Sequence, residues 1–364
     1  MLEIEAGFVR AYYLFDVADT IDLRGISTLA GEGLSPAEFP LRPHTSSAYL
    51  QFPLPPLVAH LPEATIDDLR CTVRVKLFDY GVISLRLSFV AKGTWDELAA
   101  LAERVRTDVS VAGFAAATGS HICDEIAGAL DDRHEPLIED YFAIEIDRFT
   151  QSVDARELLE RHGAALACTL LGENVPLSDS ETEEALRVRF SYTPDDLTLV
   201  QWDTAFVYDR GDSARAIEDI LEFANSQLLE LRTYDALLDR ELDSIYKMNP
   251  RSSSGSLRGR REAEQAETLR YLLVDVLELI DRSSNALKVV GDAYYARIYR
   301  AAAKRLGLAQ WQRQIDSKLA SVNDMYRYFS DRARARRDEF LELVIIALIA
   351  LELLVGIAEL VRLH

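Results

Sequence analysis

Side chains of three metal-binding types lie close together around position 121 of this chain. His121, Cys123 and Asp124 bring an imidazole, a thiol and a carboxylate within four residues, and zinc is bound by these side-chain types. A zinc site needs three or four ligands, and we find no second cluster elsewhere in the sequence that would complete one. We therefore interpret the three residues as structural and predict no metal site.

The sequence also contains none of the short motifs that indicate a common catalytic or nucleotide-binding site. The patterns G-x-x-x-x-G-K-[ST], G-x-G-x-x-G after a strand, H-E-x-x-H and G-x-S-x-G are all absent. His134 and His162 have no serine or cysteine motif beside them. We therefore predict no cofactor and no catalytic residue, and we expect a protein that is not an enzyme.

The composition narrows the class of partner. Forty Lys and Arg stand against 60 Asp and Glu, so the net charge is −20, and a nucleic-acid surface needs a basic footprint instead. The three cysteines, Cys71, Cys123 and Cys168, are far apart and odd in number, which suits a reducing compartment. The acidic N-terminus lacks the features of a signal or transit peptide.

The segment from Phe340 to Val361 is the most apolar part of the chain. Its length corresponds to roughly 33 Å of helix, which matches the hydrocarbon core of a bilayer. Glu352 lies near its midpoint and costs ~3 kcal/mol on insertion, whereas Glu342 and Glu359 lie nearer the headgroups. The sequence predicts one C-terminal transmembrane helix, and a buried helix in a soluble bundle is the alternative.

The charges that flank this segment predict its orientation. Four arginines precede it and only Arg362 follows it, so the positive-inside rule places the large N-terminal part in the cytoplasm. We expect contact with membrane lipid, and Glu352 facing another copy or another membrane protein; local water penetration around this carboxyl is the alternative. The preceding arginines are Arg332, Arg334, Arg336 and Arg337.

The remaining elements predict an α+β body. Residues 69–91 alternate polar and apolar side chains on both sides of a turn, which indicates a hairpin with one buried and one wet face. Thr94 and Glu97 form a capping-box pattern that begins a helix. A second hairpin is predicted over 185–208, followed by helical stripes to residue 338.

We therefore expect antiparallel sheets with covering helices, then long antiparallel helices of coiled-coil type, then the membrane helix. The predicted domains are an N-terminal strand and loop segment (1–65), the α+β body (66–212), a long-helix stalk (213–338) and the anchor (339–364).

Two segments resemble the "required for meiotic nuclear division" family. Residues 78–82 resemble its F-D-Y-G-V hairpin turn, and residues 341–352 resemble its terminal helix, L-E-x-x-I-I-x-L-I-x-x-E. The resemblance carries over Phe78, Asp79, Tyr80, Gly81, Glu342 and Glu352. Eukaryotic members resemble mitochondrial inner-membrane proteins and bacterial members have no assigned activity. Because the chain lacks a transit peptide, the resemblance implies a single-pass protein of the bacterial inner membrane.

The function that we expect is a membrane-anchored, homo-oligomeric scaffold or interaction protein with no enzymatic activity. One alternative is an ion-conducting assembly that resembles the CorA-type channels, although the chain lacks their Gly-Met-Asn loop. The other alternative is an anchored enzyme, which would need a polar pocket in the α+β body.

Overall fold

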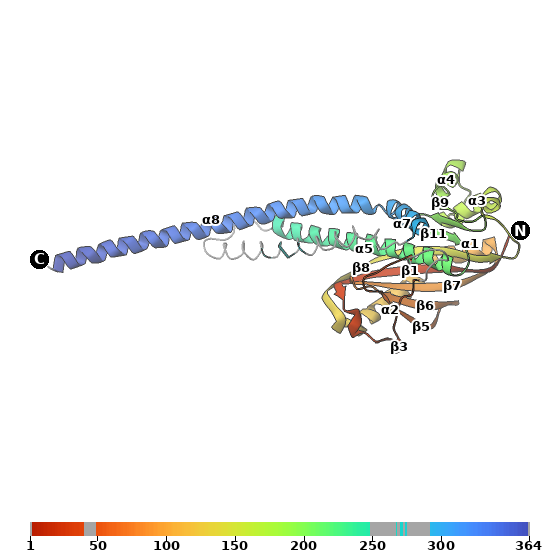
Figure 1. Ribbon diagram of the computed structural model, residues 1–364, viewed down its shortest axis with the longest axis horizontal. Helices are drawn as coiled ribbons and strands as arrows, with labels where there is room; N and C mark the ends of the chain where they lie inside the picture. The colour runs from red at the N-terminus through yellow and green to blue at the C-terminus, as the bar shows by residue number, and fades with distance from the viewer. Residues whose placement is uncertain are drawn as a thin grey trace. The chain divides into compact units, whose positions relative to one another are not determined.

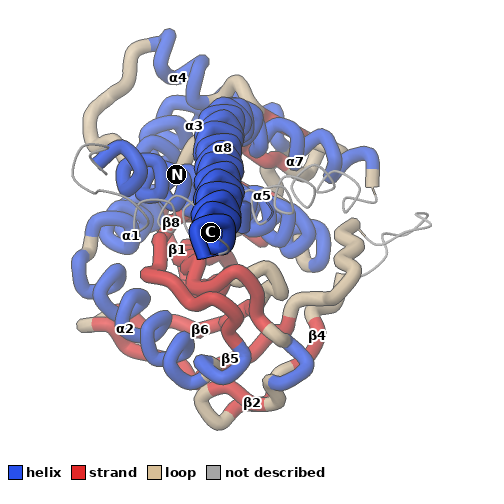
Figure 2. Tube along the Cα trace, turned by 90° about the vertical axis from the view of Figure 1, so that its left-hand side faces the viewer, coloured by secondary structure: helices blue, strands red, loops and turns tan. Residues whose placement is uncertain are grey.

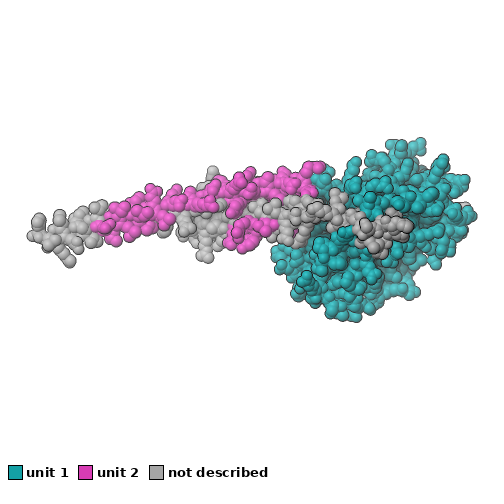
Figure 3. Space-filling view, viewed as in Figure 1, with its two compact units in different colours: residues 1–233, 283–311 teal, residues 234–282, 312–364 magenta. Residues whose placement is uncertain are grey.

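The computed structural model describes residues 2–39, 49–247, 267, 270, 271, 274 and 292–362. The chain divides into two compact units, which are coloured separately in Figure 3. The first unit contains residues 1–233 and 283–311, and the second contains residues 234–282 and 312–364. Of the helical stripes expected up to residue 338, the part from 248 to 291 lies mostly outside the described residues.

The first unit is built on a large sheet with helices on both faces (Figure 1). Its strands are β1 (Glu3–Ile21), β4 (Ser35–Pro36), β5 (Leu57–Ile66), β6 (Leu69–Leu77), β7 (Val82–Thr94), β8 (Leu130–Phe149), β9 (Arg189–Phe190), β10 (Leu197–Val200) and β11 (Thr204–Tyr208). The strands β2 (Thr28–Leu29) and β3 (Glu32–Gly33) form a separate pair.

The described helices are α1 (Trp95–Thr107), α2 (Val109–Glu125), α3 (Ala155–Leu171), α4 (Asp179–Ala185), α5 (Asp212–Lys247), α7 (Ala293–Arg305) and α8 (Leu308–Arg362). Two short 3₁₀ turns, η1 (Leu23–Gly25) and η2 (Ala127–Ala129), complete the set.

The sheet is mixed, which corrects the prediction of antiparallel sheets. Its strand order is β4-β5-β6-β7-β1-β8-β11-β10-β9, and β11 pairs parallel with β8. The predicted second hairpin is different in the structure: β10 and β11 form a hairpin within 197–208, and only the short β9 precedes it. A chain that returns through helices α3 and α4 can enter the sheet in either direction, and the residue pattern of β11 does not reveal which.

The first hairpin is confirmed. Strands β6 and β7 pair antiparallel from Cys71 opposite Phe89 to Leu77 opposite Ile83. The capping box at the start of α1 is also confirmed, with Thr94 and Glu97 bonded to each other's backbone. The strand expected in the N-terminal segment 1–65 is the central strand β1, which pairs with β7 and β8.

Alternation along the central strands gives the sheet two very different faces. Val9, Ala11 and Tyr13 on β1 belong to the apolar core, together with residues of α1, α2 and α3 such as Leu98 and Leu158. The residues between them, such as Arg10, face the other way, because successive side chains of a strand alternate. Figure 2 shows α1 and α2 on one side of the strands and α5 on the other. The second face is therefore covered by α5.

The predicted transmembrane helix is not supported. Among the residues that the structure describes, no helix is long and apolar enough to cross a membrane. Residues 341–352 of α8 include Glu342 and Glu352, and a carboxylate in the hydrocarbon core of a bilayer is costly. The predicted single-pass location in the bacterial inner membrane is overturned with it.

Candidate functional site

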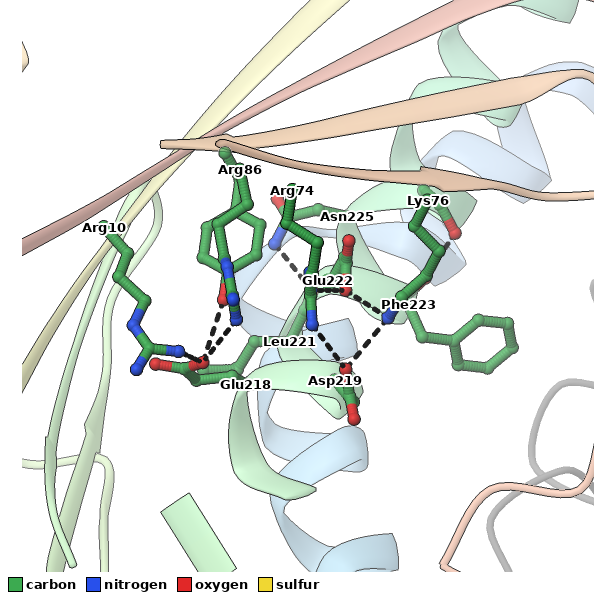
Figure 4. Close-up of polar contacts among 12 residues, drawn as sticks. Arg10, Arg74, Lys76, Arg86, Glu218, Asp219, Leu221, Glu222, Phe223 and Asn225 are labelled. Carbon is green, nitrogen blue, oxygen red and sulfur yellow. Dashed lines mark hydrogen bonds and ion pairs between the residues drawn. The ribbon is translucent and has the colours of Figure 1, made fainter. Parts of the chain in front are cut away.

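A cluster of four cationic side chains lies on the face of the sheet that α5 covers. Arg74 and Lys76 come from β6, Arg86 from β7 and Arg10 from β1 (Figure 4). Arg74 lies directly opposite Arg86 in the strand register, and Arg10 is opposite Ser88 of β7. Like charges placed opposite each other destabilise a strand pair, so these strands require anions close by.

Helix α5 supplies three carboxylates. Glu218, Asp219 and Glu222 lie on one side of the helix, because residues three or four apart share a face. The carboxylate of Glu218 accepts bonds from Arg10, from Tyr12 at 3.2 Å and from Arg86 at 3.5 Å.

The other two carboxylates bind the two cations of β6. Lys76 donates to Glu222 at 2.5 Å and to Asp219 at 2.9 Å. Arg74 donates to Glu222 at 2.9 Å and lies 3.8 Å from Asp219. All four side chains are almost fully buried. Removing one partner of such a buried ion pair leaves the other charge uncompensated, which destabilises the folded protein by about 3–5 kcal/mol.

The pKa of each carboxyl group in the network depends on which charged groups lie next to it. Burial raises the pKa of Asp219 and Glu222, but attraction by Lys76 and Arg74 outweighs it, so both pKa values lie below their ordinary range. Burial and repulsion from Arg74 lower the pKa of the Arg86 guanidinium. Asp219 and Glu222 are therefore charged in the folded protein.

Glu145 of β8 behaves in the opposite way. It forms an ion pair with Arg10, which also binds Glu218. Burial, together with repulsion from Glu218, raises the pKa of Glu145 to about 8. The raised pKa favours the protonated form of this carboxyl at neutral pH.

The predicted turn at residues 78–82 lies at one end of this network. Phe78 is buried and stacks on Tyr80, with ring centroids 5.0 Å apart. The Tyr80 hydroxyl and the Ser226 hydroxyl of α5 are 2.8 Å apart. The backbone N–H of Ile21 donates to the carbonyl of Asp79 at 2.9 Å. The turn therefore clamps the hairpin to β1 and to α5.

Gly81 makes this clamp possible. Its φ is +89°, and a Cβ at this position would lie 1.7 Å from the carbonyl oxygen of Ala18. Because the turn lies this close to β1, the backbone N–H of Val17 also donates to the Gly81 carbonyl at 3.1 Å. Only glycine accepts this conformation at this distance.

The structure does not bring the other family-like residues to this site. Glu342 and Glu352 lie on α8 in the second unit, as do the positions of Arg332, Arg334, Arg336 and Arg337. Glu342, Glu352 and Arg334 are exposed. The two halves of the expected motif set thus belong to different units of the chain.

The candidate metal ligands His121, Cys123 and Asp124 all lie on one helix. His121 and Cys123 lie on α2, where Cys123 is buried, and burial raises the pKa of its thiol. No group of three His, Cys, Asp or Glu residues suited to a metal ion occurs within the described part of the chain.

A small cavity lies elsewhere in the first unit, between α1, α3 and the sheet. Its volume is about 210 Å³, and its lining includes Trp95, Arg106, Phe142, Thr169 and Glu173. Arg106 forms an ion pair with Asp203 beside it. The lining also contains Cys168 and Thr204.

The charge network is not apparent from the residue pattern of the strands. Arg74 and Lys76 occupy polar positions of an alternating strand, which predicts a solvent-facing side. One signal was available: Glu218 and Glu222 are four residues apart, and neither has a basic residue four positions toward the C-terminus. A carboxylate pair on one face of a helix with no cation four residues further along favours cations on another element.

Comparison with known proteins identifies one family. Residues 6–214 match the family described as "Uncharacterized protein MJ0711, N-terminal domain". The uncharacterized protein MJ0711 of Methanocaldococcus jannaschii is 22% identical over 213 residues, which cover 58% of this chain and 65% of that protein. The match therefore spans just under two thirds of the relative's length. No solved structure matches the chain.

These comparisons overturn the resemblance to the meiotic nuclear division family, which they do not support. The motifs behind it were short. The turn at 78–82 follows from the geometry that Gly81 must adopt and from buried aromatic packing, and residues 341–352 share mainly an apolar composition. Such features recur in unrelated proteins.

Proposed function

The chain belongs to the family of the uncharacterized protein MJ0711 N-terminal domain, whose description names no activity, and we propose that it is a non-enzymatic interaction protein that self-associates through helix α8. The matched residues, 6–214, end before α8 begins. The proposal therefore rests on the residues of α8 and not on the relative.

One observation supports it above all. Eight large apolar side chains of α8 are exposed by 37–64% over three turns of helix. They are Leu341, Leu343, Val344, Ile345, Ile346, Leu348, Ile349 and Leu351. Apolar surface gathered in this way marks an interaction site on a protein.

The energy available suits association of identical chains. Complete burial of a Leu, Ile or Val side chain is worth about 1.5–3 kcal/mol, so covering the exposed half of eight of them yields roughly 6–12 kcal/mol per chain. The cost of association is estimated at about 4–15 kcal/mol. Two or more copies each contribute the same surface, so the balance favours assembly at micromolar concentration.

The distribution around the helix indicates a bundle. At 100° per residue, the eight side chains surround the whole circumference, and a helix that is apolar on all sides is normally buried on all sides. A single partner helix covers one face only. We therefore expect more than two copies of α8 to pack together.

The test is the mass of the full-length protein in solution, measured by light scattering over micromolar concentrations. We expect an oligomer for the natural sequence and a monomer for the double substitution Ile345→Lys with Ile349→Lys, which places two charges on one face of α8. Val109→Lys is the matched control, because Val109 is 83% exposed on α2 in the first unit. A monomeric natural protein, or an oligomer that survives the double substitution, contradicts the proposal.

A further inference from the structure

The cavity between α1, α3 and the sheet, which we call the α1–α3 cavity, has a volume of about 210 Å³. One water molecule occupies about 30 Å³ in the liquid, so the cavity has room for a small organic molecule. Pockets for drug-sized ligands begin at about 300 Å³, which sets an upper limit on the size of the ligand. Every residue that lines the cavity belongs to the first unit, so the cavity is a feature of that unit alone.

The floor of the cavity is apolar and partly aromatic. Val9 of β1 lies directly opposite Ile144 of β8, and both are buried, as is Phe142 of β8. Trp95 of α1 completes the floor, and its indole N–H donates to the hydroxyl of Thr169 at 3.0 Å. This bond holds the indole ring in place as part of the wall. Such a surface binds the apolar body of a ligand, and aromatic rings also attract cations.

Carboxylates surround this floor. Asp96 and Glu103 come from one face of α1, because residues seven apart on a helix share a face. Glu173 follows the end of α3 and also lines the cavity. Among the described residues that line the cavity, Arg106 is the single basic one, and it forms an ion pair with Asp203. Three carboxylates therefore remain beside one cation that is already balanced.

The end of α3 adds to the negative potential. This helix ends at Leu171, and the C-terminal end of a helix carries a partial negative charge. The guanidinium of Arg106 donates to the Leu170 carbonyl at 3.3 Å and lies 6.0 Å from the centre of the Phe142 ring. A cation of the protein itself is therefore bound at this helix end and over the aromatic floor, which indicates the sign of charge that the cavity stabilises.

Glu103 is held ready for a further donor. The side-chain amide of Asn174 donates to its carboxylate at 2.6 Å, and both residues line the cavity. An ionised carboxylate offers about four acceptor sites, so this bond fixes the position of Glu103 and leaves acceptor sites for a ligand.

We propose that the α1–α3 cavity binds a small organic cation that has an apolar or aromatic body and one ammonium group. The body lies on the floor that contains Trp95 and Phe142, and the ammonium group donates to Glu103 and Glu173. An ammonium group has three N–H donors and no acceptor, which matches a lining rich in carboxylate oxygens. The net charge of −20 also attracts cations to the protein and repels anions.

The experiment measures binding of three probes to the full-length protein by isothermal titration calorimetry at millimolar ligand. Phenethylamine, phenethyl alcohol and phenylacetate share one aromatic ring and differ in the charge of the head group. We expect phenethylamine to bind at least about tenfold more tightly than phenethyl alcohol, because hydrogen bonds to charged groups are stronger than neutral ones. Phenylacetate should bind more weakly than either.

Two variants test the location of the site. Ala99→Leu places a larger side chain in the cavity and should abolish binding of phenethylamine. Ala100→Leu is the matched control, because Ala100 is an exposed neighbour on α1 that does not line the cavity, and it should bind as the natural protein does. Unfolding midpoints of both variants show whether the fold is retained.

A third variant tests the charge. Glu103→Gln with Glu173→Gln keeps the shape of both side chains and an acceptor oxygen for Asn174. It should bind phenethylamine at least about fivefold more weakly, since charge-assisted hydrogen bonds become neutral ones, and should leave the affinity for phenethyl alcohol unchanged.

Each possible result decides the proposal. Selective binding of phenethylamine that is lost in Ala99→Leu and weakened in the double glutamine variant supports it. Absence of binding by all three probes overturns it, and so does equal affinity for the amine and the alcohol, or a preference for phenylacetate. Binding that Ala99→Leu leaves unchanged lies elsewhere and also overturns it. Because self-association is assigned to α8, failure here leaves that proposal untouched.

Discussion

Glu145→Gln is expected to change the pH dependence of stability. The pKa of Glu145 is raised from an ordinary value of 4.5 to about 8 in the folded protein, so between these values the folded state holds one more proton than the unfolded state. The free energy of unfolding therefore falls as pH rises through this window. Each pH unit corresponds to about 1.4 kcal/mol at most, and between pH 6 and pH 8 the loss should reach about 2 kcal/mol.

Glutamine has the shape of the protonated carboxyl and does not titrate, so the variant should lack this loss. We would measure urea unfolding of both proteins at pH 6 and pH 8 and derive the free energy of unfolding from midpoint and slope. The variant should gain about 2 kcal/mol relative to the natural protein between the two pH values.

The difference between the two proteins cancels the other titrating groups, including His134. For His134, burial lowers the pKa, but its hydrogen bond and attraction to Asp16 outweigh this and raise the pKa. The matched control is Glu160→Gln, whose carboxylate is exposed beside Arg156. A difference between variant and natural protein that is equal at pH 6 and pH 8 would refute the assignment of a proton to Glu145.

Three further predictions concern the elements that position α5 and the sheet, each measured by urea unfolding. Gly81→Ala should destabilise the protein by at least about 2 kcal/mol, because the added Cβ would collide with the backbone and the residue would keep a φ of +89°. The control is Gly113→Ala, which lies in helix α2 with open space around it and should stabilise the protein by about 0.5–1 kcal/mol. Equal effects of the two substitutions would contradict the reasoning. Thr94→Ala removes the cap of α1 and should cost about 1 kcal/mol; a neutral result would show that the cap is dispensable. Tyr80→Phe removes the bond to Ser226 and should cost about 1 kcal/mol, and an unchanged unfolding midpoint would show that the hydroxyl pair adds nothing.

The parts of the fold that could be predicted are those specified within one segment. The hairpin at 69–91 was visible because both strands alternate, and its register is fixed by which face is apolar. The capping box of α1 was visible because Thr94 and Glu97 are three residues apart. In both cases the decisive residues are neighbours in sequence.

The rest depends on contacts between distant segments. Lys76 and Asp219 are 143 residues apart, and nothing close to either residue indicates the other. A polar strand face covered by a helix has the same residue pattern as one exposed to water. The pattern therefore predicts that Arg74 and Arg86 face solvent. The parallel entry of β11 beside β8 is also decided by the path of the chain through α3 and α4.

The two ends of the large sheet constrain how copies of this chain can meet. The outermost described strands, β4 and β9, contain two residues each, and β4 ends in Pro36. Strand β4 pairs with β5 only at Val58 and Leu57, so residues 59–66 of β5 have no described strand on their outer side. Pro62 and the irregular register between Leu61 and Ala64 interrupt this stretch, and proline has no N–H to donate. Both features are typical of sheet edges that resist pairing with a strand from another chain.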